Sequence, residues 1–172
     1  MNDNLLRFLG NPLQLYLFLM VKPDEQLTDP LSTNLLYHQL WRKYILDDSV
    51  RKVNKNSLLA LLDALVATMY KDQELSVHIR LFETNFSAEL QYLFSHELLL
   101  KMKSNQIQFF HQTLFDYVYA RRFTEKGDSL LEVLRGQHQG LFSRAAVKSI
   151  LTFLREQNPK EYIHIIDQLL YA

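Results

Sequence analysis

The 172-residue chain has no net charge at neutral pH, 48% hydrophobic residues and 22% charged residues, and no cysteine. This composition fits one folded domain or two small ones, and it excludes disulfides, thiolate metal sites and a cysteine nucleophile. The neutral balance disfavours generic nucleic-acid binding, because proteins that hold a phosphodiester backbone are usually basic.

The first 50 residues are predicted to form a small helical bundle. A short helix over Leu5–Leu9 ends at Gly10, and a second begins with Asn11 as N-cap and Pro12 at the first helical position. The run from Leu13 to Val21 is apolar nearly all round, so we expect a buried helix. This run is shorter than the ~20 residues that a membrane span requires, and we expect neither a membrane segment nor a secretion signal.

After a polar loop over residues 23–32, a third helix is predicted to about Asp47, capped by Ser32 or Thr33, with an apolar stripe along one side. The charged segment 48–55 then connects this bundle to the next part of the chain.

Residues 51–126 are predicted to form a second domain. Ser57 is expected to open a strongly apolar helix, 77–80 alternates like a short edge strand, and 86–97 is expected to contain another helix. Two apolar runs, 98–102 and 106–110, flank a polar turn and predict a hairpin. The order helix, strand, helix, hairpin and helix is typical of a winged helix, with the hairpin as the wing.

The most informative stretch is 109–123. Residues 107–111 alternate with a strand-like period of two, and from His111 onward the apolar residues follow a helical spacing. His111 should therefore lie at a helix N-terminus, where unpaired backbone N–H groups favour an anion. A helix cap or a core position is the simpler interpretation of this histidine.

Residues 127–172 are predicted to form three helical segments. Asp128 or Ser129 is expected to cap the first and Ser143 the second. Asn158, Pro159 and Glu161 give the clearest helix start in the chain. The last two segments would form a helical hairpin with an exposed apolar side, as at the start of a repeat array.

No enzymatic motif occurs. The phosphate-binding pattern Gly-x-x-x-x-Gly-Lys-Ser/Thr, His-Glu-x-x-His and Gly-x-Ser-x-Gly are all absent from the sequence. We therefore expect no catalytic activity and no metal site in this chain.

The stretch Phe109–Ala120 resembles the motif that closes the winged-helix domain of NACHT-type STAND NTPases, which are signalling ATPases of immunity and phage defence. That motif reads roughly aromatic-x-His-x-Ser/Thr-Phe-x-Glu-aromatic-aromatic-Ala-Ala. Asp116 replaces the Glu of the motif conservatively. Five residues match the motif: Phe109, His111, Thr113, Tyr117, Ala120. Departures at Leu114, Val118 and Tyr119 leave the subfamily open.

The resemblance implies a helical lid over 1–50, a winged helix over 51–126 and a helical hairpin over 127–172. It implies that His111 reaches the β-phosphate of ADP and that Pro12 lies against the adenine. The nucleotide, ADP or ATP with Mg²⁺, would be held by a preceding domain of the same polypeptide. Exchange of ADP for ATP would then open the molecule and lead to homo-oligomers in the cytoplasm.

Two other functions remain open. A winged-helix DNA-binding protein would need cations on its recognition helix, but residues 81–100 contain no Lys or Arg, while Glu83, Glu89 and Glu97 are acidic. A helical scaffold for a protein partner is the other alternative, because the last helix carries an unpartnered apolar face.

Overall fold

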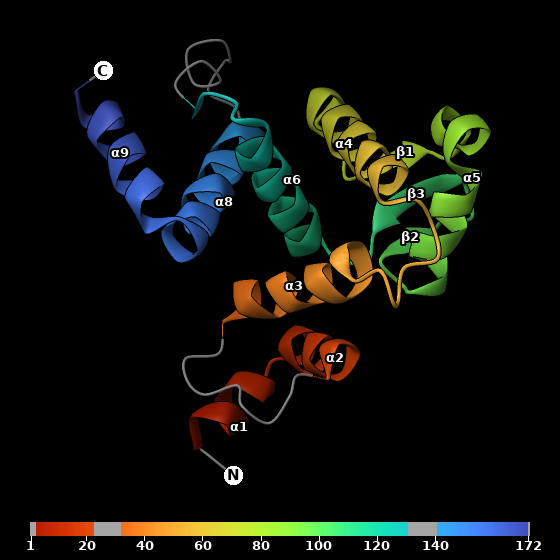
Figure 1. The fold of residues 1–172 in the computed structure, drawn as a ribbon, viewed down its shortest axis with the longest axis horizontal. Helices are drawn as coiled ribbons and strands as arrows, with labels where there is room; N and C mark the ends of the chain where they lie inside the picture. The colour runs from red at the N-terminus through yellow and green to blue at the C-terminus, as the bar shows by residue number, and fades with distance from the viewer. Residues whose placement is uncertain (1–2, 23–31, 131–140, 172) are drawn as a thin grey trace. The chain divides into compact units, whose positions relative to one another are not determined.

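The computed structural model describes residues 3–22, 32–130 and 141–171, and the chain divides into two compact units, Met1–Leu59 and Ala60–Ala172 (Figure 1). The described residues are mainly helical with one small antiparallel sheet, which confirms the predicted mainly α class with a β-hairpin. The boundary between the units lies inside one helix. The division at residues 50 and 126 stays a prediction.

The first unit contains α1 (Asp3–Leu9), α2 (Pro12–Val21), α3 (Thr33–Trp41) and the π-helical turn η1 (Arg42–Leu46). The sequence predicted a single helix to Asp47, but from Arg42 onward the backbone hydrogen bonds span five residues instead of four, as in the bond from the Asp47 N–H to the Arg42 carbonyl at 2.8 Å. Lys43, on η1, donates from Nζ to the Met20 carbonyl at 2.8 Å and so caps the end of α2. The core of this unit is apolar and aromatic: Leu17, Val21, Leu36, Tyr37, Leu40, Trp41, Ile45.

Helix α4 (Lys55–Asp72) begins before the predicted Ser57. Asn54 is the reason, because its Oδ1 accepts hydrogen bonds from the backbone N–H groups of Asn56 (2.9 Å) and Ser57 (3.1 Å). A shared acceptor of this kind satisfies two of the N–H groups that a helix start leaves unpaired.

The sheet has the order β1-β3-β2, with β1 (Ser76–His78), β2 (Leu99–Lys101) and β3 (Gln106–Phe109). Both neighbours pair antiparallel with β3, which is therefore the central strand. Helix α5 (Arg80–Ser95) begins earlier than predicted, and Phe86, at φ −134° and ψ 32°, kinks it into two segments. The element order from α4 to the next helix is the one that the sequence predicted.

Helix α6 (Gln112–Lys126) packs against α8 (Leu141–Gln157), with the Tyr117 and Phe153 ring centroids 5.7 Å apart (Figure 1). The helix predicted from residue 128 falls mostly outside the described residues. The predicted cap Ser143 is wrong, because α8 already includes it.

Helix α9 (Pro159–Leu170) confirms the predicted start, since the Asn158 side chain accepts from the Glu161 N–H at 3.3 Å. None of its residues is fully buried. Leu170, near the end of α9, is 73% exposed.

Candidate functional site

His111 is the N-cap of α6. Its backbone is extended, at φ −150° and ψ 145°, and it joins the end of β3 to the first turn of the helix. Its Nδ1 accepts from the Thr113 N–H at 3.2 Å and lies 2.9 Å from the Thr113 hydroxyl. The sequence placed His111 at this junction, and the cap prediction is confirmed.

The capping contact determines which ring nitrogen of His111 carries the proton. A nitrogen that accepts from a backbone N–H must itself be unprotonated, so in the neutral ring the proton resides on Nε2. The His111 side chain is exposed. The arrangement therefore gives α6 an N–H donor, Nε2, beside a helix N-terminus that itself favours anions.

Most other residues of the motif form the core around α6. Phe109 and Phe115 are buried, with ring centroids 6.1 Å apart, and Tyr117 and Ala120 are also buried. The matches at Phe109, Tyr117 and Ala120 are therefore explained by packing alone. Within the motif, His111 and Thr113 are the matched residues that remain exposed.

Asp116, at the motif's Glu position, is half-buried on α6. Burial raises the pKa of Asp116 to about 6, and the positive charge of Lys148 on α8 opposes this rise only in part. The Asp116 carboxyl group on α6 therefore loses its proton near pH 6, and its negative charge then faces the positive charge of Lys148 on α8.

Pro12 lies at the first position of α2, directly after Asn11, whose Oδ1 accepts from the Leu13 N–H at 2.9 Å. It is exposed, together with Leu15 and Leu19 at helical spacing. Pro12 belongs to the first unit and His111 to the second.

A charged cluster joins α4 to α6 and was not predicted. Arg122 donates from Nε and Nη2 to the two carboxylate oxygens of Asp63, at 2.6 and 2.8 Å, and Lys126 lies 3.4 Å from Asp63. Burial alone would raise the pKa of Asp63, but the hydrogen bonds and charge of Arg122, with help from Lys126, lower it. The sequence indicates only a small basic cluster at a helix C-terminus, Arg121, Arg122 and Lys126, which is favourable for the helix dipole without any ligand. The Asp63–Arg122 pair joins residues 59 positions apart, which no local pattern reveals.

In the predicted winged-helix order, the second segment of α5 would be the recognition helix. Its exposed residues carry no cation: Ser87, Ala88, Gln91, Ser95. Glu89, which the sequence analysis counted as a repelling charge, is only 8% exposed. The case against DNA binding therefore rests on the missing cations rather than on Glu89.

Within the described part of the chain, no group of three or more His, Asp or Glu side chains is placed to hold a metal ion. In the same residues, no helix is both long and apolar enough to cross a bilayer. Comparison with protein-family models, with curated proteins and with solved structures finds no match to this chain.

Proposed function

We propose that this chain is a non-catalytic regulatory module of a NACHT-type STAND signalling ATPase. The module couples the nucleotide bound by a preceding domain of the same polypeptide to opening and homo-oligomerisation in the cytoplasm. ADP holds the closed state, and exchange for ATP with Mg²⁺ releases it. His111 senses the β-phosphate, and Pro12 lies against the adenine.

The observation that supports this proposal best is the geometry of His111. Its Nδ1 is engaged by Thr113, so Nε2 is the donor that an exposed neutral ring presents. A phosphate oxygen is a strong acceptor, and the N-terminus of α6 adds a favourable dipole. The surrounding aromatic residues hold this end of α6 in place, with Phe115 and Phe109 buried beneath it.

The test uses the parent polypeptide loaded with ADP. His111→Asn keeps a good helix cap but lacks the imidazole donor, so it separates the cap from the phosphate contact. Losing a hydrogen bond to a charged phosphate is worth roughly 1.5–3 kcal/mol, which predicts release of ADP about 10- to 100-fold faster. Basal signalling should rise in parallel.

His78 provides a matched control. It is also an exposed histidine before a helix, and its Nδ1 accepts from the Arg80 N–H at 3.3 Å. His78→Asn should leave ADP release unchanged. Equal release rates for wild type and His111→Asn would refute the role of His111.

A second candidate function, a protein-interaction scaffold, is favoured by α9. Ile163, Leu170 and Tyr171 are 60%, 73% and 90% exposed, which leaves an apolar surface at this end of the second unit. The scaffold predicts association of the chain through α9 as its concentration rises, measured by sedimentation velocity. Ile163→Lys with Leu170→Lys should abolish it, and a wild-type monomer at high concentration would exclude this alternative.

A further inference from the structure

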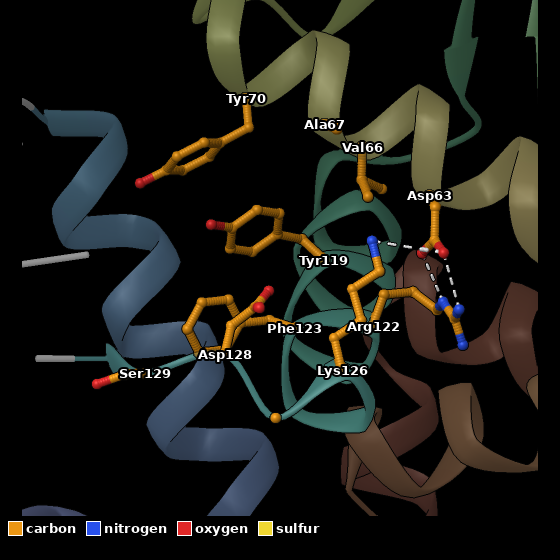
Figure 2. Close-up of a pocket in the computed structure, with 11 residues that line it drawn as sticks. Asp63, Val66, Ala67, Tyr70, Tyr119, Arg122, Phe123, Lys126, Asp128 and Ser129 are labelled. Atoms are coloured by element: carbon orange, nitrogen blue, oxygen red, sulfur yellow. Dashed lines mark hydrogen bonds and ion pairs between the residues drawn. The ribbon is translucent and has the colours of Figure 1, made fainter. Parts of the chain in front are cut away.

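A cavity of about 610 Å³ lies between α4 and the C-terminal half of α6 (Figure 2). One face of α4 lines it with Asp63, Val66, Ala67 and Tyr70. The opposite wall runs from Tyr119 on α6 to Ser129. The cavity lies wholly within the second unit, and no local pattern in the sequence predicts it.

The two sides of this cavity differ in charge. On one side, Arg122 and Lys126 both reach toward Asp63, so these cations are already engaged by a carboxylate (Figure 2). Arg122 also donates to Glu125. This side is therefore closed to a further anion, because its positive charges have partners.

The other side of the cavity is aromatic. The Tyr70 and Tyr119 rings stack with centroids 4.6 Å apart, and Tyr119 lies 6.2 Å from Phe123. Aromatic ring faces carry negative partial charge and attract organic cations within about 6 Å.

Asp128 adds a carboxylate to the aromatic side. Gly127 ends α6 in the left-handed conformation, at φ 73°, and the Asp128 N–H then returns to the Phe123 carbonyl at 3.4 Å. Figure 2 shows the Asp128 carboxylate on the same side as the Phe123 and Tyr119 rings. The Asp128 charge also contributes to a raised pKa of Tyr119, after burial and the neighbouring Tyr70. Among the residues that the structure describes, none forms an ion pair with Asp128.

The C-terminal end of α6 reinforces this polarity. Gly127, the C-cap of α6, lines the cavity, so the negative end of the helix dipole is close to it. Aromatic rings, a carboxylate and a helix C-terminus all favour positive charge, whereas Val66 and Ala67 offer an apolar wall. We propose that this cavity binds an organic cation, an ammonium or guanidinium group on an aliphatic stem, between Tyr70, Phe123 and Asp128.

The test is a titration of the full chain followed by ¹H–¹⁵N NMR. The probes are Nα-acetyl-lysine methylamide, which represents a protein side chain, and putrescine, which represents a free diamine. The uncharged Nα-acetyl-norleucine methylamide is the control ligand. We expect saturable shifts at Gly127 and Asp128 with at least one cation and not with the norleucine compound. The cation that binds more tightly identifies the source of the ligand.

Two variants examine the proposed contacts. Asp128→Asn should weaken binding about tenfold, since a charged partner is lost, and Tyr70→Leu should weaken it several-fold. Asp72→Asn removes an exposed carboxylate of α4 that does not line the cavity, and it should bind like the wild type. The inference is overturned if neither cation gives saturable shifts, if the norleucine compound binds equally well, or if Asp128→Asn binds like the wild type.

Discussion

Removal of the Asp63 carboxylate should destabilise the second unit markedly. Asp63 and Arg122 form a two-point ion pair whose side chains are only 22% and 13% exposed. Exposed ion pairs contribute about 0–1 kcal/mol, and breaking a fully buried pair costs about 3–5 kcal/mol. This pair lies between those limits, and Glu125 remains as a partner for Arg122. We therefore expect Asp63→Ala to lower the free energy of unfolding by about 2 kcal/mol.

The assay is urea unfolding followed by circular dichroism, with Asp72→Ala as the matched control on the same helix. Because the pKa of Asp63 is lowered in the folded state, its contribution is present above its ordinary pKa of about 4 and is lost as pH falls below it. The difference between wild type and Asp63→Ala should thus shrink in acid. A loss no larger than that of Asp72→Ala at neutral pH would refute the assigned strength of this pair.

Two further substitutions examine other parts of the second unit. Asp116→Asn should raise stability at neutral pH by about 1 kcal/mol, a figure discounted for the partial exposure of the side chain. Because the pKa of Asp116 rises to about 6 on folding, the wild type should lose this stability as the pH rises from about 4 to about 6. A stability advantage of Asp116→Asn that does not change with pH would contradict the reasoning. Gly127→Ala should lower the free energy of unfolding by about 1 kcal/mol, because φ is 73° at this position. Nothing lies within 4 Å of an added Cβ, so this cost is backbone strain and not a clash. Gly127→Asn should cost less, because Asn tolerates the left-handed conformation better. Equal thermal unfolding of the two Gly127 variants would exclude backbone strain as the cause.

Local signals in the sequence predicted much of the fold. Asn11 with Pro12, and Asn158 with Pro159, cap helices in the structure as their spacing indicates. His111 lies where the period of the apolar residues changes from two to that of a helix. These features depend on contacts between near neighbours in the chain, which a linear pattern records.

The predictions that were wrong or missing concern helix starts and contacts between distant parts of the chain. The sequence predicted that this helix opens at Ser57, whereas Asn54 is the cap. Both residue types cap helices, and only the backbone shows which oxygen is in reach. The first segment of α5 was missed since the kink at Phe86 interrupts the helical period. The Asp63–Arg122 pair and the stacked tyrosines join distant parts of the chain, so they required the tertiary structure.

The most direct test of the proposed function is to read the coding sequence upstream of the Met1 codon in the source genome. A switch module of a STAND ATPase requires a nucleotide-binding domain ahead of it in the same polypeptide. We predict that the reading frame continues upstream and encodes a Gly-x-x-x-x-Gly-Lys-Ser/Thr loop, whose backbone N–H groups would hold the phosphates. An in-frame stop codon directly upstream of Met1 would contradict the proposal and would favour the protein-interaction scaffold.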